Sequence, residues 1–446
     1  MRIALVSTER SPVPPLRGGA VQTYIAEVAP YLARRHEVTV IGVSDPDLPP
    51  REVRDGVRYV RLDAPAGDGT AYGWALIDYV SRHAFDVIEV FNRPLWVLPL
   101  HAACPGARLV LSLHNEMMRE TKIPLDLAAP TLKVLSRIVT VSDYIARSVV
   151  SRYPEAAAKV TTLYSGVDVD RFPRKGPLRS KALRKAMRKE MGFGDDPVIL
   201  YVGRLSRNKG PHVLLDAMPD VLRRHPRARL VMVGSRWFGT NETDDYVQAL
   251  QEKVAPLGDH VVLTGYVPYD EVHRYFAMAD VFVCSSQWAE PLARVHYEAM
   301  AAGLPIVTTE RGGNPELVRS GIHGIILEQW HDPRAFAQAI NDILDNPDMA
   351  RAMGKAGRKL VERRFTFRRL AARLEEVLEE AGEARPPAPV DEIRLDSGLL
   401  MGKGGDPHTL MNELPYARTV LKLRQRTHTV LEMLHHIRVR QGAEED

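Results

Sequence analysis

The chain repeats one pattern twice: short runs rich in apolar and β-branched residues alternate with segments of helical periodicity. In the first half, the expected strands are residues 3–7, 37–43, 57–62, 86–91, 108–114, 137–141 and 159–164. Between the first two, apolar residues from Val21 to Leu32 recur at the spacing that fills one face of a helix. Strands that alternate with helices predict a parallel, doubly wound sheet with buried strands.

The pattern starts again at residue 197. Residues 197–203 form a near-continuous apolar run, residues 211–224 have helical periodicity, and further strands are expected at 229–233, 260–264, 281–284 and 305–308. We therefore predict an α/β protein with two Rossmann-like domains, residues 1–172 and 197–366, separated by a charged linker at 173–196. Because ligands of this architecture bind at the carboxyl edges of the strands, the expected site is a cleft between the two domains.

Composition excludes several classes of protein. The 446 residues suffice for two or three domains, and no apolar run approaches the ~20 residues of a transmembrane helix. The first ten residues are typical of a strand rather than of a secretory signal. Two cysteines, Cys104 and Cys284, cannot by themselves form a disulfide framework or a cysteine-based zinc site. We expect a cytoplasmic protein.

The net charge of +4 conceals one strongly basic segment. Between Arg171 and Lys189 there are nine basic residues and no acidic one, which leaves 51 basic against 56 acidic residues elsewhere. A generally basic protein with a nucleic acid as its partner is therefore not expected. The favoured interpretation of residues 171–189 is a solvated helix, and peripheral contact with a membrane surface is the alternative.

A basic loop follows the first strand of the second half. Its sequence is Gly203-Arg-Leu-Ser-Arg-Asn-Lys-Gly210. Cations that point from a strand end into a cleft suit a phosphorylated ligand, because charge-assisted bonds to phosphate strengthen away from water. Arg204 can hold two oxygens with its planar guanidinium, and Lys209 adds a point charge. Taken alone, such a loop is more often solvated surface.

Two glutamates eight residues apart form a second group. They lie in the segment Ala289-Glu-Pro-Leu-Ala-Arg-Val-His-Tyr-Glu-Ala-Met-Ala-Ala-Gly-Leu-Pro305. A helix that began near Leu292 would direct its free amide groups at an anion. Glu290 could then accept hydrogen bonds from sugar hydroxyls, and Glu298, two turns further on, from those of a ribose. The alternative, two solvated glutamates on an exposed helix, is weakened by the many apolar neighbours.

Together these motifs resemble those of the retaining, nucleotide-sugar-dependent glycosyltransferases of family 4, which have the two-Rossmann-domain fold called GT-B. The resemblance covers roughly residues 1–380. It rests on four separated motifs: Arg17-Gly-Gly-Ala-Val21, Gly203-Arg-Leu205 with Lys209-Gly210, the pair Glu290 and Glu298 with seven residues between them, and Tyr164-Ser-Gly-Val-Asp168 followed by Arg171-Phe172. It implies an acceptor-binding first domain and a donor-binding second domain.

The resemblance implies how the donor diphosphate is held. Arg204 and Lys209 would neutralise the diphosphate and stabilise it as the leaving group. Gly18 and Gly19 would let backbone amides approach the phosphate, which a Cβ atom would block.

The resemblance also implies roles for three further side chains. Glu290 would hold the donor sugar, Glu298 the ribose, and His114, at the end of a strand, would lie near the reacting sugar carbon. A lone histidine is more often structural, but its place at a carboxyl end of a strand favours function here.

The mechanism that the resemblance implies is front-face transfer with retention of configuration, in which the departing phosphate accepts the proton of the acceptor. Stabilising charge on the diphosphate would be the main contribution of the protein. The strings Asp45-Pro-Asp47 and Asp168-Val-Asp170 lie outside the donor half. We therefore expect no metal and no cofactor beyond the co-substrate, a nucleotide sugar such as a UDP- or GDP-sugar.

One departure from the family pattern concerns the residues after Glu290-Pro291. The family commonly has Phe-Gly there, whereas this chain has Leu292-Ala293 followed by Arg294. Because alanine tolerates positive φ poorly, the loop should be less strained, or the donor should sit differently. Arg294 is expected either near the phosphates, as a third cation, or pointing outward in an ion pair.

Three segments most resemble the spore-coat-associated branch of the family. They are the segment from Glu290 to Glu298, Ser235-Arg-Trp-Phe-Gly239 and Glu89-Val-Phe-Asn-Arg-Pro94. Spore-coat association or a peripheral place at the membrane is therefore an alternative to a free cytoplasmic enzyme. A catalytically weak homologue that acts as a scaffold, and a sugar-nucleotide epimerase of the same fold, are the alternative functions. A dehydrogenase is disfavoured, since no Gly-x-Gly-x-x-Gly follows the first strand. The acceptor, a glycan, lipid, protein or small metabolite, stays open.

Four segments complete the expectations. Gly312-Gly-Asn-Pro-Glu316 predicts a helix start with Asn314 as its cap and a supporting role for Glu316. The resemblance implies that a helix at 367–383 crosses back onto the first domain. The tail, 384–446, has no assigned role; residues 420–439 could form a helix. Trp237 and Phe238 either cover the donor or fill the core.

Overall fold

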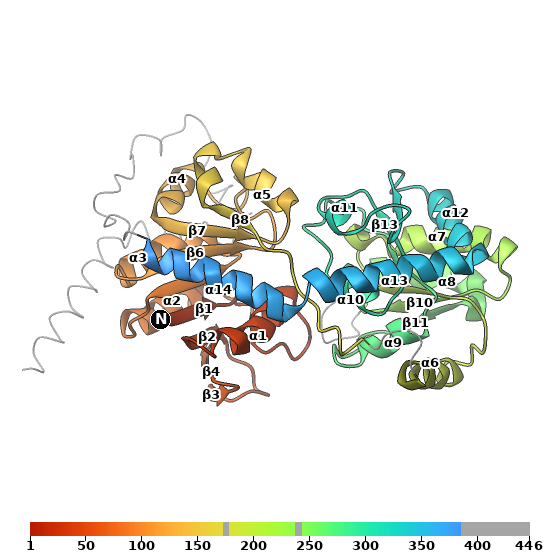
Figure 1. The fold of residues 1–446 in the computed structure, drawn as a ribbon, viewed down its shortest axis with the longest axis horizontal. Coiled ribbons are helices and arrows are strands. Elements are labelled where there is room, and N and C mark those ends of the chain that lie inside the picture. The colour runs from red at the N-terminus through yellow and green to blue at the C-terminus, as the bar shows by residue number, and fades with distance from the viewer. Residues whose placement is uncertain (173–177, 237–242, 385–446) are drawn as a thin grey trace, which may run out of the picture.

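Two parallel sheets form where the sequence pattern repeats. The computed structural model describes residues 1–172, 178–236 and 243–384, which build two α/β lobes side by side (Figure 1). The predicted segments 420–439 and Trp237-Phe238 lie outside the described residues.

The N-terminal lobe contains an eight-stranded sheet in the order β3-β4-β2-β1-β5-β6-β7-β8. Its strands are β1 (Arg2–Val6), β2 (Glu37–Val43), β3 (Arg51–Arg54), β4 (Val57–Leu62), β5 (Val87–Phe91), β6 (Arg108–Leu113), β7 (Leu135–Thr140) and β8 (Val160–Thr162). All neighbouring strands pair in parallel except β3, which is antiparallel to β4. The sequence pattern missed β3, because this edge strand has a single apolar residue, Val53, which is 73% exposed.

The C-terminal lobe contains a wholly parallel six-stranded sheet in the order β11-β10-β9-β12-β13-β14. Its strands are β9 (Val198–Val202), β10 (Arg229–Val233), β11 (Val261–Leu263), β12 (Val281–Cys284), β13 (Ile306–Thr309) and β14 (Gly324–Leu327). Only the four-residue β14 was not predicted. The α/β class with two doubly wound, Rossmann-like sheets is confirmed.

Helices cover both faces of each sheet (Figure 1). In the N-terminal lobe they are α1 (Ala20–Leu32), α2 (Gly69–Ser81), α3 (Val97–Ala103), α4 (Leu125–Val134) and α5 (Asp143–Val150). The helices numbered after these are α6 (Leu178–Glu190), α7 (Pro211–Arg224), α8 (Asp245–Val254), α9 (Val272–Met278), α10 (Val295–Ala301), α11 (Asn314–Leu317), α12 (Pro333–Asp345), α13 (Pro347–Arg364) and α14 (Phe367–Glu383). Among the described residues, no helix is both long and apolar enough to cross a bilayer.

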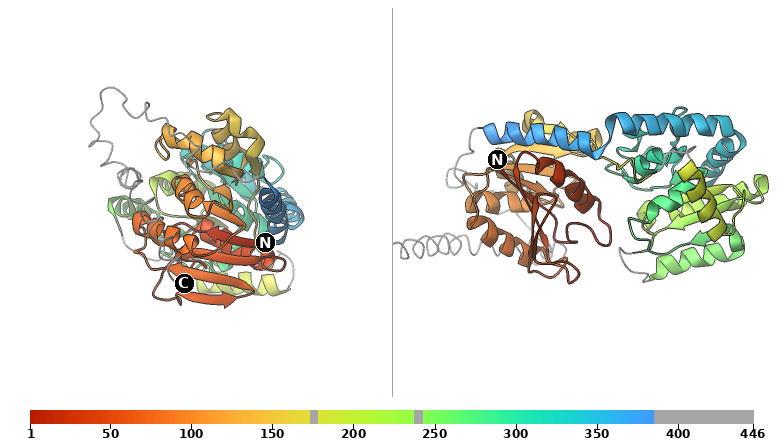
Figure 2. Two further views of the ribbon diagram at one scale, coloured as in Figure 1. Left: turned by 90° about the vertical axis from the view of Figure 1, so that its left-hand side faces the viewer. Right: turned by 60° about the horizontal axis from the view of Figure 1, so that its bottom comes forward.

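The last helix, α14, packs on the N-terminal lobe although α13, directly before it, packs on the C-terminal lobe (Figures 1 and 2). Its buried residues recur at three- and four-residue intervals: Phe367, Leu370, Ala371, Leu374, Val377, Leu378 and Ala381. They share one apolar cluster with Ile3 and Leu5 of β1 and with residues of α1. The helix thus completes the core on one face of the N-terminal sheet.

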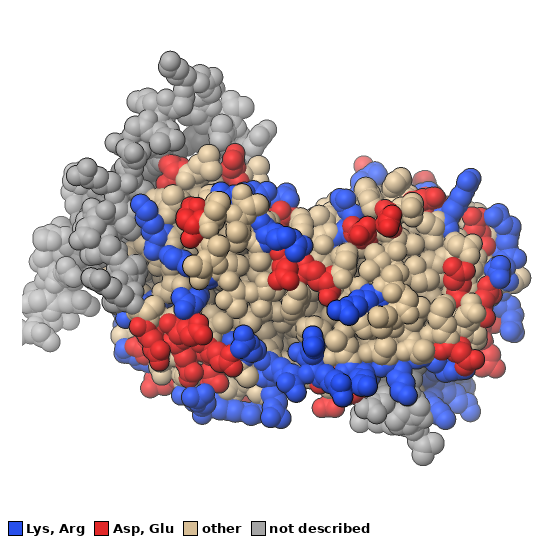
Figure 3. Space-filling view, turned by 45° about the horizontal axis from the view of Figure 1, so that its top comes forward, with Lys and Arg blue, Asp and Glu red and all other residues tan. Residues whose placement is uncertain are grey.

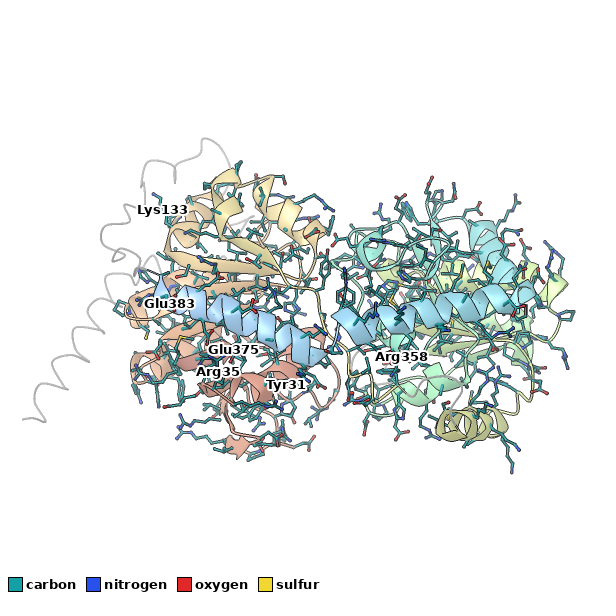
Figure 4. The ribbon with its side chains drawn as sticks, in the orientation of Figure 1. Tyr31, Arg35, Lys133, Arg358, Glu375 and Glu383 are labelled. Atoms are coloured by element: carbon teal, nitrogen blue, oxygen red, sulfur yellow. The ribbon has the colours of Figure 1, made fainter. Side chains whose placement is uncertain are left out.

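Charged contacts fix α14 beside the end of α1 (Figure 4). Arg35 lies 3.2 Å from a carboxylate oxygen of Glu375 and 3.2 Å from one of Glu379. His36 Nε2 lies 3.2 Å and 3.6 Å from the same two side chains. These contacts add to the apolar packing at the surface of the lobe.

The basic segment expected at 171–189 contains α6, which packs against α9 of the C-terminal lobe. Arg184 and Arg188 each lie 2.6 Å from a different carboxylate oxygen of Asp280. Arg184 and Arg188 are therefore paired with the protein itself, and Arg171 lies 3.9 Å from Glu27 and from Asp168. Figure 3 shows further Lys and Arg side chains in a band along one edge of the surface that spans both lobes.

Candidate active site

The site begins at the centre of the C-terminal sheet, between β9 and β12. The chain runs from β9 through α7 to β10 on one side, whereas β12 lies on the other, so the strand order reverses here. Loops at such a switch point diverge and leave room for a ligand at the carboxyl ends of the strands. Arg204 and Lys209 follow β9, and Glu290 follows β12.

Lys209 and Glu290, 81 residues apart, are joined by a direct ion pair between the Lys209 ammonium and Glu290 Oε1. Ser286 Oγ donates to the same carboxylate oxygen at 2.5 Å. The Glu290 side chain is 4% exposed, whereas that of Lys209 is 25% exposed. A lysine ammonium has three donors, so pairing with Glu290 leaves it able to bind a second anion.

The charge on Glu290 is set by two opposing effects. Burial acts to raise its pKa, but the attraction and hydrogen bond of Lys209 and the hydrogen bond of Ser286 outweigh it and hold the pKa below the ordinary value. Glu290 is therefore an ionised acceptor at neutral pH. Buried acceptors of this kind can receive hydrogen bonds from hydroxyl groups of a sugar.

Arg204 is half-buried at the start of the same loop, and the Tyr201 hydroxyl donates to its carbonyl at 2.8 Å. Burial lowers the pKa of Arg204, and the nearby Arg236 lowers it further. Arginine nevertheless stays protonated at neutral pH. The loop therefore offers a partly desolvated guanidinium on the same side of the sheet as Lys209, where a bond to an anion is strengthened.

The loop after Glu290 differs from the expectation in its helix start. The helix α10 begins at Val295, three residues later than the predicted start near Leu292. Leu292 and Ala293 are buried, and the Ala293 amide already donates to Asn314 Oδ1 at 3.4 Å. The predicted row of free amides at Leu292 is therefore wrong. Among the described residues other than glycine, only Asp55 and Asn92 have positive φ, so the Leu292-Ala293 pair is unstrained, as expected for a loop without Phe-Gly.

Asn314 is likewise not the cap that the sequence predicted. It lies inside α11, whose cap position is Gly313, and its side chain is directed to Ala293 instead. The helix-start prediction itself is confirmed, since α11 begins at Asn314 with Pro315 in its first turn.

Arg294 and Glu298 form the part of the site nearest the other lobe. Arg294 Nη2 lies 3.8 Å from Glu298 Oε1 and donates to the Tyr269 hydroxyl at 3.3 Å, while Nη1 donates to the Ala20 carbonyl at 3.4 Å. Burial raises the pKa of Glu298, and Arg294 and then Arg171 act against it. Arg294 is thus ion-paired, as the second of the two expectations for this residue stated. Its side chain, however, points across the junction between the lobes rather than outward.

The N-terminal lobe contributes the loop after β1. Gly18 and Gly19 have φ of 99° and 135°, and a Cβ at Gly19 would lie 2.4 Å from Gln22 Oε1. Glycine is therefore required where this loop turns into α1. Tyr266 of the C-terminal lobe donates to the Leu16 carbonyl at 3.4 Å. Together with the Arg294 contact to Ala20, this contact places the glycine-rich loop opposite the Glu290–Glu298 motif.

Arg17, in the same motif, has a structural partner. Its guanidinium lies 2.6 Å from Asp45 and 2.7 Å from Asp47. The first Asp-x-Asp string therefore holds the glycine-rich loop against β2.

His114 follows β6 on the N-terminal side. Its amide donates to Asn92 Oδ1 at 2.7 Å, and its ring contacts Tyr24 edge-on at 4.9 Å between centroids. Burial, assisted by Arg294, lowers the pKa of His114 to about 3. The imidazole is therefore neutral at pH 7 and can act as a hydrogen-bond partner but not as a cation.

One group of side chains has the residue types that could bind a metal ion. The ligand atoms of His36, Glu375 and Glu379 lie within 4.8 Å of one another, and in the described part of the chain no other such group occurs. Arg35 already pairs with both carboxylates, and the group lies where α1 meets α14 on the N-terminal lobe, whereas Lys209 and Glu290 belong to the C-terminal lobe.

Several residues of this site had no sequence signal. Ser286 donates to Glu290, and the Tyr269 hydroxyl accepts from Arg294, but neither residue belongs to a motif of the sequence. The sequence did single out Asn314, as a helix cap, but not its contact with the Ala293 amide. Serine after a buried strand is too common to be distinguished by pattern alone.

The fold and this site define a class: glycosyltransferases of the GT-B fold. The chain has the fold of an Anabaena HepE structure in complex with UDP-glucose, with a TM-score of 0.68 and 21% identity over 85% of this chain and 99% of that one. It has the fold of a sucrose-phosphate synthase from Thermosynechococcus elongatus as well, with a TM-score of 0.71, 22% identity and coverage of 85% and 98%.

The family follows from sequence. Residues 17–171 match the model "Glycosyltransferase Family 4", and residues 184–360 match "Glycosyl transferases group 1". Spore coat protein SA of Bacillus subtilis is 44% identical over 85% of this chain and all of its own length. A GDP-mannose-dependent phosphatidylinositol monomannoside mannosyltransferase of Mycolicibacterium smegmatis is 32% identical, with coverage of 83% and 97%. The chain belongs to glycosyltransferase family 4 and is an enzyme of the glycosyltransferase class.

Proposed function

We propose that the protein transfers a sugar from a nucleoside-diphosphate sugar to an acceptor with retention of configuration. The observation that carries this proposal is the buried Lys209–Glu290–Ser286 cluster, which lies at the switch point of the C-terminal sheet beside Arg204. It combines a cation for a diphosphate with an ionised acceptor for sugar hydroxyls. The HepE structure with UDP-glucose and the GDP-mannose-dependent relative support a nucleotide sugar as the donor.

In this mechanism the donor lies along the C-terminal lobe. Arg204 and Lys209 bind the diphosphate and stabilise the negative charge that grows on it as the glycosidic bond breaks. Glu290 orients the donor sugar, and Glu298 binds the ribose. Because Glu298 Oε1 lies 3.8 Å from Arg294 Nη2, ribose binding would also affect the contact of Arg294 with the Ala20 carbonyl across the lobe junction.

The acceptor enters from the N-terminal lobe, where His114 and the Gly18-Gly19 loop lie. The leaving phosphate accepts the proton of the attacking hydroxyl, so the protein supplies no dedicated base. His114, neutral at pH 7, contributes a hydrogen bond near the reacting carbon rather than a charge. The closure of the lobes excludes water from a hydrolysable donor.

We propose that no metal ion takes part, since the two cations occupy the place that a metal would otherwise have at the diphosphate. Full activity after treatment with EDTA is the expected result. An enzyme that stays inert until a divalent ion is added would contradict this part of the proposal.

The donor is tested by screening UDP-, GDP-, ADP- and dTDP-sugars for thermal protection and for slow hydrolysis. One nucleotide should raise the melting temperature in a saturable way. A folded protein that none of the four protects, and that hydrolyses none, would favour the scaffold alternative. Nothing in the unstrained Leu292-Ala293 loop supports that alternative, and membership of the family favours transfer over epimerisation.

A further inference from the structure

Glu316 belongs to the C-terminal lobe, but within the described part of the chain its carboxylate contacts residues of the N-terminal lobe. Its Oε2 accepts from the Asp143 amide at 2.8 Å, and its Oε1 accepts from the Tyr144 amide at 2.6 Å. The Tyr164 hydroxyl donates to Oε2 at 3.0 Å. Arg147 lies 3.6 Å away. The side chain is 13% exposed, so these contacts are largely shielded from water.

These bonds complete the start of α5. The first amides of a helix have no partner within the helix, and the helix dipole favours negative charge at this end. Ser142 Oγ accepts from the Ile145 amide at 3.2 Å. Glu316 accepts from the two preceding amides, so a side chain of the opposite lobe supplies most of this cap.

The turn that carries Glu316 also supports the proposed donor site. The Gly313 amide donates to the Glu290 carbonyl at 2.8 Å. Gly312 has φ of 62°, and a Cβ there would lie 1.9 Å from that carbonyl oxygen. Asn314 accepts from the Ala293 amide. Residues 312–316 therefore lie between the backbone of the Glu290 loop and the first turn of α5.

We propose that Glu316 is a positioning residue that fixes the acceptor-binding lobe in register with the Glu290 loop. It touches no substrate. Instead, it determines the position of α5 and of the rest of the N-terminal lobe when donor and acceptor are brought together. This inference rests on the proposed function for the assignment of the two lobes to donor and acceptor.

The test separates positioning from donor binding. Glu316→Gln keeps the shape but loses the charge and replaces one acceptor oxygen by an amide that faces backbone N–H groups. We expect turnover with the donor identified by the screen to fall about tenfold, while the dissociation constant for the free nucleoside diphosphate, measured by calorimetry, changes less than about twofold. Tyr164→Phe removes one donor to the carboxylate and should lower turnover about threefold. Glu310→Gln, at an exposed glutamate of the same lobe, is the matched control.

A second readout requires no activity. X-ray scattering of the full chain without ligand should give a larger radius of gyration for Glu316→Gln than for the wild type and for Glu310→Gln. Unchanged scattering and unchanged turnover would overturn the proposal, and so would a loss of nucleotide affinity equal to the loss of turnover. If Glu316→Gln does not fold, Tyr164→Phe carries the same comparison. A wild type that binds no nucleotide refutes the proposed function instead, and scattering then still decides whether Glu316 holds the lobes together.

Discussion

Two buried glutamates, one in each lobe, have pKa values shifted in opposite directions. Glu89 of β5 and Glu290 after β12 are 0% and 3% exposed, and each accepts a hydrogen bond from a serine hydroxyl. Burial raises the pKa of Glu89 to about 7, although its serine acts against this. The pKa of Glu290 stays below the ordinary value because Lys209 is paired with it.

For these two carboxylates the difference lies in the neighbouring cation: Lys209 pairs with Glu290 and lowers its pKa, whereas burial outweighs the serine at Glu89 and raises its pKa. The C-terminal lobe keeps charge at the carboxyl edge of its sheet, as the binding of a diphosphate requires. The N-terminal lobe has a buried acid with a pKa of about 7, Glu89, and a neutral histidine, His114, as well as a buried ion pair between Arg93 and Glu9.

The largest expected effect comes from removing that charge. Lys209→Ala or Arg204→Ala should lower turnover by about a hundredfold or more, because each removes a preorganised charge from the developing diphosphate. Turnover at saturating donor is the measurement. Lys253→Ala, which removes a surface lysine paired with Asp216, is the control and should leave turnover unchanged. A loss below about threefold for Lys209→Ala would show that charge is not concentrated in this lobe.

The second prediction concerns Glu89 and the pH dependence of stability. Its folded-state pKa of about 7 lies above the ordinary 4.5, so the folded protein retains a proton that the unfolded chain releases. Stability from this group is complete below pH 4.5 and is lost as the pH rises through about 7. Relative to Glu89→Gln, the wild type should lose on the order of 2 kcal/mol between pH 5 and 8 in urea unfolding.

Glu290→Gln is compared with the wild type by the same urea unfolding. The pH dependence of the difference in stability should have the opposite sign. Because the pKa of Glu290 is lowered in the folded state, its contribution is present above its ordinary pKa and is lost as the pH falls below about 4.5. The same sign for both glutamates would remove the contrast between the lobes.

The third prediction concerns His114. His114→Ala should lower turnover about tenfold through loss of a hydrogen bond and packing against Tyr24. Because the pKa of His114 is about 3, the pH profile of the wild type should show no transition of this residue near 6.5. A transition near 6.5 that disappears in the variant would mean that the histidine is charged during turnover.

The smallest effects should separate the two serines. At about pH 5.5, between the pKa values of the two carboxylates, Ser286→Ala removes a hydrogen bond to an ionised carboxylate and should cost about 2 kcal/mol of stability, whereas Ser112→Ala, at a protonated one, should cost about 1 kcal/mol. Chemical denaturation of both variants gives the comparison. Equal costs would indicate that the two carboxylates carry the same charge.

Most strands could be predicted from the sequence, because parallel strands that are buried on both faces are continuous apolar runs. It failed at β3, whose residues are mostly exposed, and at the start of α10, which was expected near Leu292 but lies at Val295. That helix start depends on Asn314, which lies 21 residues further along and takes up the Ala293 amide. The partners of Glu316, more than 150 residues away, follow from the placement of the two lobes, which no local pattern records.

The position of α14 has a consequence for synthesis of the chain on the ribosome. The residues that close one face of the first sheet, from Phe367 to Ala381, emerge only after the whole second lobe has been translated. Until then Ile3, Leu5 and their neighbours in the same cluster lack their covering helix. The lobe made first is therefore completed last, and nascent chains stopped before residue 367 present an apolar surface to chaperones.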